Sequence, residues 1–453
     1  MVSRNSELKT LQSIYESTGN QIVLLSGNAR SEKERLALTF CRDKKYFYYR
    51  GRNASAEEQL SQLKMQIEDS YGIKLMKNSF DECFTRIKSG DASKLVVVID
   101  EFQSIVKKDV SFFKSILNLK NKKLYPGPVM ILLMNSSLAW TRQSMAEVLG
   151  TDMGAIDHLI ELKEFSFLDV VRAFPEYSVA DAVAVYGIVG GCPAYLNRWN
   201  GKKTIRENVC NLILHPYGIL HNEAEDFISK ELRELSVYDT ILYALAIGNE
   251  KLNDLYRFTG YSRAKISVYL KNLAAFDVVE KVVSFETGGW DNAKKGIYRI
   301  KNPFLHFWFK FVYTNQSRLW TGTPDDFYET YISKELNAYL TPYFVKVCSE
   351  YLGLLNMVGQ TPIKITRTGT WLGKEGTIDI IGQDDERESV VGICNWEKEA
   401  LTFDDYQNLL FSMKQARIHA KVTYLFSATS FDERLQELEK EESSIVLVDM
   451  KEL

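Results

Sequence analysis

The 453-residue sequence has few of the features that mark secreted, metal-binding or membrane proteins. Its six cysteines form no CxxC pair and its five histidines are scattered, so nothing supports a zinc site or a disulfide framework. No apolar run reaches the length of a membrane span, and Met1 leads into a polar segment rather than a signal peptide. These absences predict a cytoplasmic protein with free thiols and no membrane contact.

Flexible linkers and strong charge are also missing. Only nine prolines and no low-complexity tract predict domains that abut without long linkers. A formal net charge of −3 gives no global attraction to nucleic acid or anionic membrane, although a local basic face stays open. The remaining composition, 45% apolar and 25% charged residues, is that of a globular chain long enough for two to four domains.

Residues 21–35 organise the N-terminal part of the chain. An apolar run at 22–25 predicts a strand buried on both faces, and Gly27 starts a loop that leads into a predicted helix over 33–40. A strand, a glycine-started loop and a helix with lysine in its first turn are the layout of a phosphate-binding P-loop. Backbone N–H groups would face the phosphates, and Lys33 would neutralise them.

The match departs from the pattern G-x-x-x-x-G-K-[ST] at two positions. Glu32 replaces the second glycine, and Glu34 replaces the hydroxyl residue. If Glu32 must be left-handed, that conformation costs about 1–2 kcal/mol. A carboxylate near a phosphate adds repulsion of order 4 kcal/mol at an effective dielectric near 20. Glu34 keeps an oxygen that could ligate Mg²⁺. The alternative is a strand, turn and helix that bind nothing.

A second nucleotide motif follows at residues 95–102, where a buried apolar strand ends in Asp100 and Glu101. It fits a Walker B segment, with Asp100 holding Mg²⁺ and Glu101 orienting the attacking water. The alternative is a strand followed by a helix-capping aspartate. The predicted strand 129–135 also ends in a polar residue. Asn135 would sense a γ-phosphate or, alternatively, cap the next helix.

The N-terminal segments alternate between strand and helix. Five such strands predict an α/β fold with a parallel sheet between layers of helices. Besides the P-loop and Walker B strands, the predicted strands are 46–50, 129–135 and 158–162; the predicted helices are 3–16, 33–40, 56–69 and 79–87.

From Leu168 the pattern is helical to about His215, broken by a glycine-rich turn at 190–193. Two further helices, 253–258 and 262–274, have the spacing of a helix-turn-helix. Strands at 278–284 and 296–300 would form the wing of a winged helix.

The second helix of this predicted winged helix carries Arg263, Lys265 and Lys271, residue types that a DNA-reading helix uses. Between residues 236 and 300, nine Lys and Arg face seven Asp and Glu, so the module is only weakly basic. The alternative is a module that only packs.

The C-terminal third predicts a second α/β domain. The aromatic stretch 302–309 predicts a segment that packs between domains rather than a binding site. Residues 331–354 predict a long helix. The predicted strands are near 363–367, 377–382, 389–394, 422–426 and 444–448, and the predicted helices near 404–414 and 430–440.

With these segments placed, nearly the whole chain resembles a family of prokaryotic AAA+/STAND-type P-loop ATPases. The likeness is carried by Val2-Ser3-Arg4-Asn5, Gly27 with Lys33, Ile99-Asp100-Glu101-Phe102, Gly190-Gly191-Cys192-Pro193-Ala194-Tyr195-Leu196, Tyr298-Arg299-Ile300-Lys301-Asn302-Pro303-Phe304, Gly376-Thr377-Ile378-Asp379-Ile380-Ile381 and Val391-Gly392-Ile393-Cys394-Asn395-Trp396. The resemblance implies four parts: a P-loop ATPase-like domain (1–165), a helical lid (166–235), a winged helix (236–315) and a restriction-endonuclease-like domain (316–453). It implies ATP and Mg²⁺ as cofactors. It also adds Arg4, from the opening motif, to the nucleotide-binding residues Gly27, Lys33, Glu34 and Asp100.

The endonuclease-like part departs from the family pattern of an Asp followed by Glu-Cys-Lys. Asp379 is present and would be a metal ligand, but Ile393 stands at the Glu position and Asn395 at the Lys position. Glu397 is no replacement, since four residues of strand place it roughly 13 Å from the lost position. Both catalytic centres therefore look eroded.

Three hypotheses follow. The first is a nucleotide-binding switch or scaffold with weak or absent hydrolysis, and the second is a DNA-binding winged-helix protein with an inactive nuclease-like domain. The third is a live ATPase that tolerates Glu32 and Glu34. The partners would be a nucleotide, double-stranded DNA or another protein.

Overall fold

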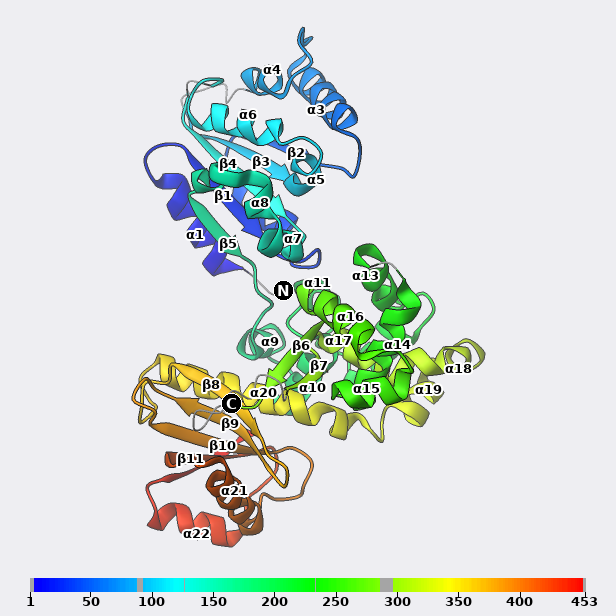
Figure 1. Cartoon of the computed structure of the whole chain (residues 1–453), viewed down its shortest axis with the longest axis vertical. Helices are drawn as coiled ribbons and strands as arrows, with labels where there is room; N and C mark the ends of the chain where they lie inside the picture. Colours follow the sequence, from blue (N-terminus) through cyan, green and yellow to red (C-terminus); the bar gives the residue numbers. More distant parts are fainter. Residues whose placement is uncertain (1–3, 88–92, 126, 233, 286–295, 451–453) are drawn as a thin grey trace. The chain divides into compact units, whose positions relative to one another are not determined.

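The computed structural model describes residues 4–87, 93–125, 127–232, 234–285 and 296–450 (Figure 1). The chain forms two compact units. Val2–Glu164 and the short segment Cys192–Ala194 make the first unit, and Phe165–Gly191 with Tyr195–Leu453 make the second. All six cysteines are free thiols. Among the described helices, none combines the length and the apolar character that crossing a bilayer requires.

The first unit is a five-stranded parallel sheet between helices, as the sequence predicts. The strand order β2-β3-β4-β1-β5 puts β4 between the P-loop strand β1 and the Asp-Glu-ending strand β3. The strands are β1 (Gln21–Ser26), β2 (Tyr46–Arg50), β3 (Leu95–Asp100), β4 (Val129–Asn135) and β5 (His158–Glu161). All five predicted strands are therefore confirmed to within about one residue.

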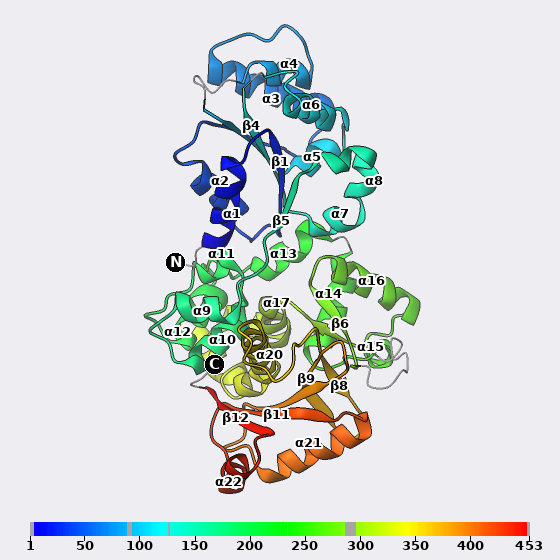
Figure 2. The same cartoon turned by 90° about the vertical axis from the view of Figure 1, so that its left-hand side faces the viewer.

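Helices cover both faces of this sheet, which explains the unbroken apolar runs of its central strands. Ile22 and Leu24 of β1 face one core cluster, while Val23 and Leu25 face the other. Figure 2 shows α1 and α2 on one side and α5, α7 and α8 on the other. The helices are α1 (Asn5–Glu16), α2 (Lys33–Cys41), α3 (Ala56–Tyr71), α4 (Phe80–Thr85), α5 (Phe102–Val106), α6 (Ser111–Lys120), α7 (Leu138–Gln143) and α8 (Met145–Leu149). Ser3, the predicted start of the first helix, lies outside the described residues.

The second unit begins with helices, as predicted after Leu168. Helix α10 (Val179–Val189) is buried along most of its length and packs on α17 (Pro303–Phe307) and α20 (Leu336–Met357). The aromatic stretch after Asn302 belongs to this core, where Phe304 and Phe307 are fully buried. The neighbouring helices are α9 (Phe167–Ala173), α11 (Pro193–Leu196), α12 (Ile205–Val209), α13 (Glu223–Glu231), α18 (Gln316–Thr321) and α19 (Pro324–Tyr331).

The glycine-rich break after α10 has a steric cause. Gly190 has φ +65°, and the backbone of Gly191 passes so close to Phe165 that a Cβ there would lie 1.9 Å from the Phe165 carbonyl oxygen. Gly191 accepts a 2.8 Å hydrogen bond from the Phe165 N–H. The Gly-Gly pair is therefore required by this close approach.

The helix-turn-helix pattern forms as predicted. Helices α14 (Leu235–Ala246), α15 (Leu252–Thr259) and α16 (Arg263–Ala275) pack in sequence, and β6 (Val279–Val283) pairs antiparallel with β7 (Gly296–Ile300). We call these five elements the helix-hairpin module. Residues 286–295, between its strands, lie outside the described part of the chain.

The C-terminal part is a separate five-stranded mixed sheet, with order β12-β11-β10-β9-β8. The strands are β8 (Arg367–Leu372), β9 (Thr377–Gln383), β10 (Ser389–Asn395), β11 (Ala420–Ser427) and β12 (Ile445–Asp449). Helices α21 (Phe403–Ala416) and α22 (Glu433–Glu441) contribute Leu409, Met413 and Leu435 to its core.

The first predicted strand of this sheet, near 363–367, was wrong. Ile363 and Ile365 are buried as the alternation suggested, but the backbone N–H and C=O of Ile365 both bond to the side chain of Asn356. The amide of Asn356 thus satisfies the groups that would have joined a ladder. The strand forms instead at β8, four residues further on.

The end of β6 joins the C-terminal sheet. The Phe285 N–H donates a 2.8 Å hydrogen bond to the Thr370 carbonyl, and the Leu372 N–H donates a 2.9 Å bond to the Ser284 hydroxyl. The Phe285 side chain belongs to the hydrophobic core of that sheet. The helix-hairpin module and the C-terminal sheet are therefore packed together inside the second unit.

Candidate nucleotide site

The loop after β1 has the backbone conformation that a P-loop requires. Glu32, at the position of the second glycine, caps α2 in the left-handed region with φ 57° and ψ 37°. A Cβ on Gly27 would lie 2.8 Å from the Ser31 hydroxyl and 3.1 Å from the Leu162 Cβ, so only glycine fits there. The loop keeps its shape without its second glycine, at a strain of about 1–2 kcal/mol.

Lys33 is folded back over this loop. Its ammonium donates hydrogen bonds of 2.9 and 2.8 Å to the carbonyl oxygens of Gly27 and Asn28. Burial lowers the pKa of Lys33 to about 8, and the nearby carboxylates of Glu101 and Asp100 act against this fall. The charge therefore lies at the carboxyl end of β1, where its third hydrogen bond, 3.4 Å long, goes to the Ser31 hydroxyl.

Asp100 ends β3 as an almost fully buried side chain. Its Oδ1 accepts the Glu101 N–H at 2.9 Å, and its Oδ2 accepts the Tyr48 hydroxyl at 2.9 Å. The Arg50 Nε lies 3.5 Å from the same Oδ2. Burial raises the pKa of Asp100 to about 6, against the lowering effect of the Tyr48 hydrogen bond. Each oxygen of this carboxylate thus accepts one hydrogen bond.

Glu34 occupies the position of the P-loop hydroxyl, in the first turn of α2. Its Oε1 forms a 2.9 Å ion pair with Arg50 Nη1. One guanidinium therefore contacts both residues that a P-loop would direct at a metal, Glu34 and Asp100. One oxygen of each carboxylate therefore faces a guanidinium at the positions where a P-loop would hold Mg²⁺.

Glu101, the predicted base, adopts a left-handed conformation with φ 52° just after β3. Its Oε2 accepts a 2.6 Å hydrogen bond from the Ser136 hydroxyl and another from the Gln103 amide. The carboxylate is held toward the end of β4 by these two donors, which compete with any water it would orient.

Asn135 is fully buried at the end of β4. Its Oδ1 accepts the Ser137 N–H at 2.9 Å, and its amide donates to the Ser137 carbonyl at 3.2 Å and to the Thr141 hydroxyl. These bonds tie it to the start of α7. The N-cap of α7 is Ser137, so the predicted capping role of Asn135 was wrong, and its role as a γ-phosphate sensor stays a prediction.

Two side chains at the site were not predicted: Tyr48 and Arg50. A signal for both was present, since they alternate on β2 and so share one face. Arg50 also ends its strand, at the edge where parallel sheets bind ligands.

The comparison with known proteins identifies this unit. A family model described as an ATPase domain predominantly from Archaea matches residues 1–198. Residues 1–198 therefore match an archaeal ATPase family, which confirms this part of the resemblance drawn from the motifs. A second model, which describes archaeal and bacterial proteins of unknown function, matches residues 308–409.

One curated relative covers most of the chain. An uncharacterized protein of Methanocaldococcus jannaschii is 25% identical over 402 residues, which is 87% of each chain. Its similarity therefore extends beyond the ATPase domain into the second unit.

Several solved structures are similar to parts of the chain at low identity. The Walker-type ATPase of Pyrococcus abyssi has 16% identity and a TM-score of 0.45, over 68% of this chain and 96% of its own. The ORC2 protein of Aeropyrum pernix, solved with ADPNP and ADP, has 15% identity and a TM-score of 0.44, over 68% and 93%. The STAND protein PH0952 of Pyrococcus horikoshii has 14% identity and a TM-score of 0.29, over 79% and 50%.

Arg4 lies at the edge of the ATPase domain, buried as the N-cap residue of α1. Its guanidinium donates to the carbonyl oxygens of Ser31 and Lys163 and pairs with Glu7 at 2.9 Å. Arg4 is therefore hydrogen-bonded to the loop 27–33 through Ser31.

The predicted DNA-binding residues lie in the second unit, on α16. Arg263 and Lys265 are exposed in its first turn. The Arg263 guanidinium stacks 4.2 Å from the Tyr256 ring centroid, and the Lys265 ammonium lies 4.7 Å from that of Tyr261. Lys271 is exposed two turns later. The two basic side chains at the start of α16 therefore each pack on an aromatic ring, one from α15 and one from the turn before α16.

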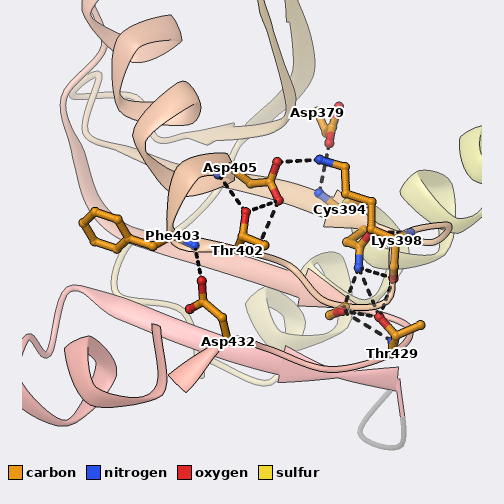
Figure 3. A network of polar contacts seen from close by, with 10 residues as sticks. Asp379, Cys394, Lys398, Thr402, Phe403, Asp405, Thr429 and Asp432 are labelled. Atoms are coloured by element: carbon orange, nitrogen blue, oxygen red, sulfur yellow. Dashed lines mark hydrogen bonds and ion pairs between the residues drawn. The ribbon is translucent and has the colours of Figure 1, made fainter. Parts of the chain in front are cut away.

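The endonuclease-like positions hold a network of hydrogen bonds. Asp379 accepts the Cys394 N–H at 2.9 Å, and burial raises its pKa. The Asn395 amide donates to the Lys398 carbonyl and to the hydroxyls of Ser427 and Thr429, each at 3.1 Å. Figure 3 shows Asp379 beside Cys394. It also labels Lys398 and Thr429, which accept hydrogen bonds from the Asn395 amide. Among the described residues, no three His, Cys, Asp or Glu side chains gather as a metal site.

Proposed function

We propose that the ATPase domain binds a nucleoside di- or triphosphate at the loop 27–33, turns it over slowly or not at all, and acts as a nucleotide-dependent switch or scaffold. The main support is Lys33, whose buried ammonium is held over the loop by the Gly27 and Asn28 carbonyls. Phosphate oxygens are stronger partners than these carbonyls, because they carry charge. The N–H groups at the start of α2, a nine-residue helix, also favour a phosphate there, because the N-terminal end of a helix is partially positive.

Weak turnover follows from the carboxylates around this loop. Glu32 and Glu34 replace uncharged residues next to the phosphate position, which weakens binding. Glu101, which would orient water, is hydrogen-bonded to Ser136 and Gln103 instead. These contacts support nucleotide binding without efficient hydrolysis, as the proposed switch or scaffold requires.

Thermal unfolding with ADP or ATP tests this function. A ligand at 100-fold over its Kd adds about 2.7 kcal/mol to the free energy of unfolding. The stabilisation should disappear in Lys33→Met, which keeps the buried stem and loses the charge. The double variant Glu32→Gly/Glu34→Thr restores the P-loop pattern and should bind ATP more tightly. A wild-type protein that shows no shift, together with a double variant that gains none, would reject nucleotide binding at this loop.

A second candidate function is duplex DNA binding through α16. Its support is the exposed pair Arg263 and Lys265, placed at the N-terminal end of the second helix of a helix-turn-helix. The stacking on Tyr256 and Tyr261 orders both cations before any phosphate arrives. A duplex shift assay at several salt concentrations separates this function from the first.

For the C-terminal sheet we propose a structural or partner-binding role rather than nuclease activity. Asp379 is bonded to backbone, Ile393 offers no ligand, and the Asn395 amide holds the loop after β10 in place. The Glu and the Lys that the resemblance expects at positions 393 and 395 are replaced by Ile393 and Asn395.

A further inference from the structure

Arg50 occupies a defined place in the sheet. It is the last residue of β2, and the strand register pairs it directly with Asp100 of β3. Tyr48, two residues earlier, lies on the same face and bonds to the same carboxylate. The side chain of Arg50 is thus aimed along the sheet edge at Asp100, with its position fixed by backbone pairing.

The guanidinium bridges two carboxylates that come from different elements. Nη1 lies 2.9 Å from Glu34 of α2, and Nε lies 3.5 Å from Asp100 of β3. In a P-loop ATPase the residues at these two positions hold the magnesium ion. Here the first of them is a carboxylate instead of a hydroxyl. A positive group therefore lies between the two carboxylates and offsets one of their two charges.

Arginine is suited to replace a metal at a phosphate. It is always charged, and its planar fork recognises phosphate oxygens directly. The two ion pairs use Nε and Nη1, and 56% of the side chain is exposed, so the N–H groups of Nη2 remain for a ligand. The substitution of Glu34 for the hydroxyl residue and the presence of Arg50 are thereby explained together.

We propose that Arg50 takes the place of the divalent cation, so that this site binds nucleotide polyphosphates without Mg²⁺. The proposal rests on the proposed nucleotide function for its ligand. It adds the specific statement that the Glu34–Arg50–Asp100 group excludes the metal that P-loop proteins otherwise use.

Metal alone tests the exclusion without any nucleotide. Mn²⁺ is titrated into the full chain and followed by its electron paramagnetic resonance signal. The wild type should show no saturable site, whereas Arg50→Met should gain one, because the two carboxylates are then released. That new site should vanish in Arg50→Met/Glu34→Gln. Wild-type binding of Mn²⁺ that Glu34→Gln abolishes would overturn the proposal, and so would an Arg50→Met variant that binds none.

Nucleotide titrations give the second arm. By calorimetry, the wild-type Kd for ADP or ATP should differ less than twofold between Mg²⁺ and EDTA. In Arg50→Met, affinity in EDTA should fall about tenfold and recover when Mg²⁺ is added. A tenfold gain of the wild type with Mg²⁺ would contradict the proposal. If the wild type binds no nucleotide at all, the proposed function fails, while the manganese arm still decides the role of Arg50. Arg50→Lys, which keeps the charge, controls for folding.

Discussion

The Ser136 hydroxyl donates a 2.6 Å hydrogen bond to Glu101, the carboxylate that would have to orient an attacking water. The donor comes from the end of β4, next to the strand that carries the acceptor. This bond occupies one of the two oxygens of the Glu101 carboxylate.

Removal of this donor should raise any ATP turnover. Hydrogen bonds to charged groups contribute about 1.5 kcal/mol or more, so Ser136→Ala should increase kcat by up to about tenfold. Gln103 stays as the remaining donor and limits the gain. Ser137→Ala is the matched control, because Ser137 caps α7 and does not contact Glu101. A slower Ser136→Ala enzyme would mean that Ser136 holds Glu101 in a productive position.

Substitutions at Glu32 separate backbone strain from charge. Glu32→Gly and Glu32→Ala both remove the carboxylate and its ion pair with Arg35, but only glycine relieves the left-handed conformation. Glu32→Gly should therefore be about 1 kcal/mol more stable than Glu32→Ala in urea unfolding. Both should bind nucleotide more tightly than the wild type. Equal stability of the two variants would show that the loop relaxes around alanine.

Nucleotide binding should take up a proton at alkaline pH. Burial lowers the pKa of Lys33 to about 8 in the free protein, and a bound phosphate favours the ammonium and raises that pKa again. Between about pH 8 and pH 10, part of the lysine is neutral before binding and charged afterwards. Calorimetry in buffers of different ionisation enthalpy should report this uptake, and Lys33→Met should abolish both the uptake and the binding. Proton release in this range would contradict the assignment.

Duplex binding, if it runs through α16, depends on Arg263 and Lys265. Charge reversal of both should abolish the shift, and reversal of one should flatten the salt slope by about one unit for each lost phosphate contact. Lys414 and Lys440, exposed on α21 and α22, provide a matched double reversal that should leave binding unchanged. Equal loss in both double variants would indicate a general charge effect and move the DNA surface elsewhere.

The C-terminal sheet should not cut DNA. A supercoiled plasmid with Mg²⁺ or Mn²⁺ should stay intact, because Asp379 is a lone carboxylate already bonded to the Cys394 N–H. Nicking that disappears in Asp379→Ala would reveal a working metal site, and with it a different alignment of residues 393–395.

The sequence predicted what depends on local pattern. The unbroken apolar runs predicted β1, β3 and β4 as strands buried on both faces. The P-loop spacing predicted that Lys33 begins α2 and that Glu32 would have to be left-handed. The role of Arg50 could not be predicted from local pattern, because its contact with Asp100 depends on the pairing of β2 with β3. The strand expected near 363–367 failed for a similar reason: Asn356, on the preceding helix, satisfies the backbone of Ile365, and no periodicity records that contact.

The position of Phe285 has a consequence for how this protein can be divided. A cut after residue 315, where the sequence suggests a boundary, would leave Phe285 on a fragment without the core it fills. The other fragment would expose β8 as an unprotected edge, the kind of surface that recruits strands from neighbouring molecules. Fragments made at that boundary are therefore expected to aggregate, and expression trials should keep residues 236–450 together. Because they share this core, the helix-hairpin module and the C-terminal sheet should unfold in a single thermal transition.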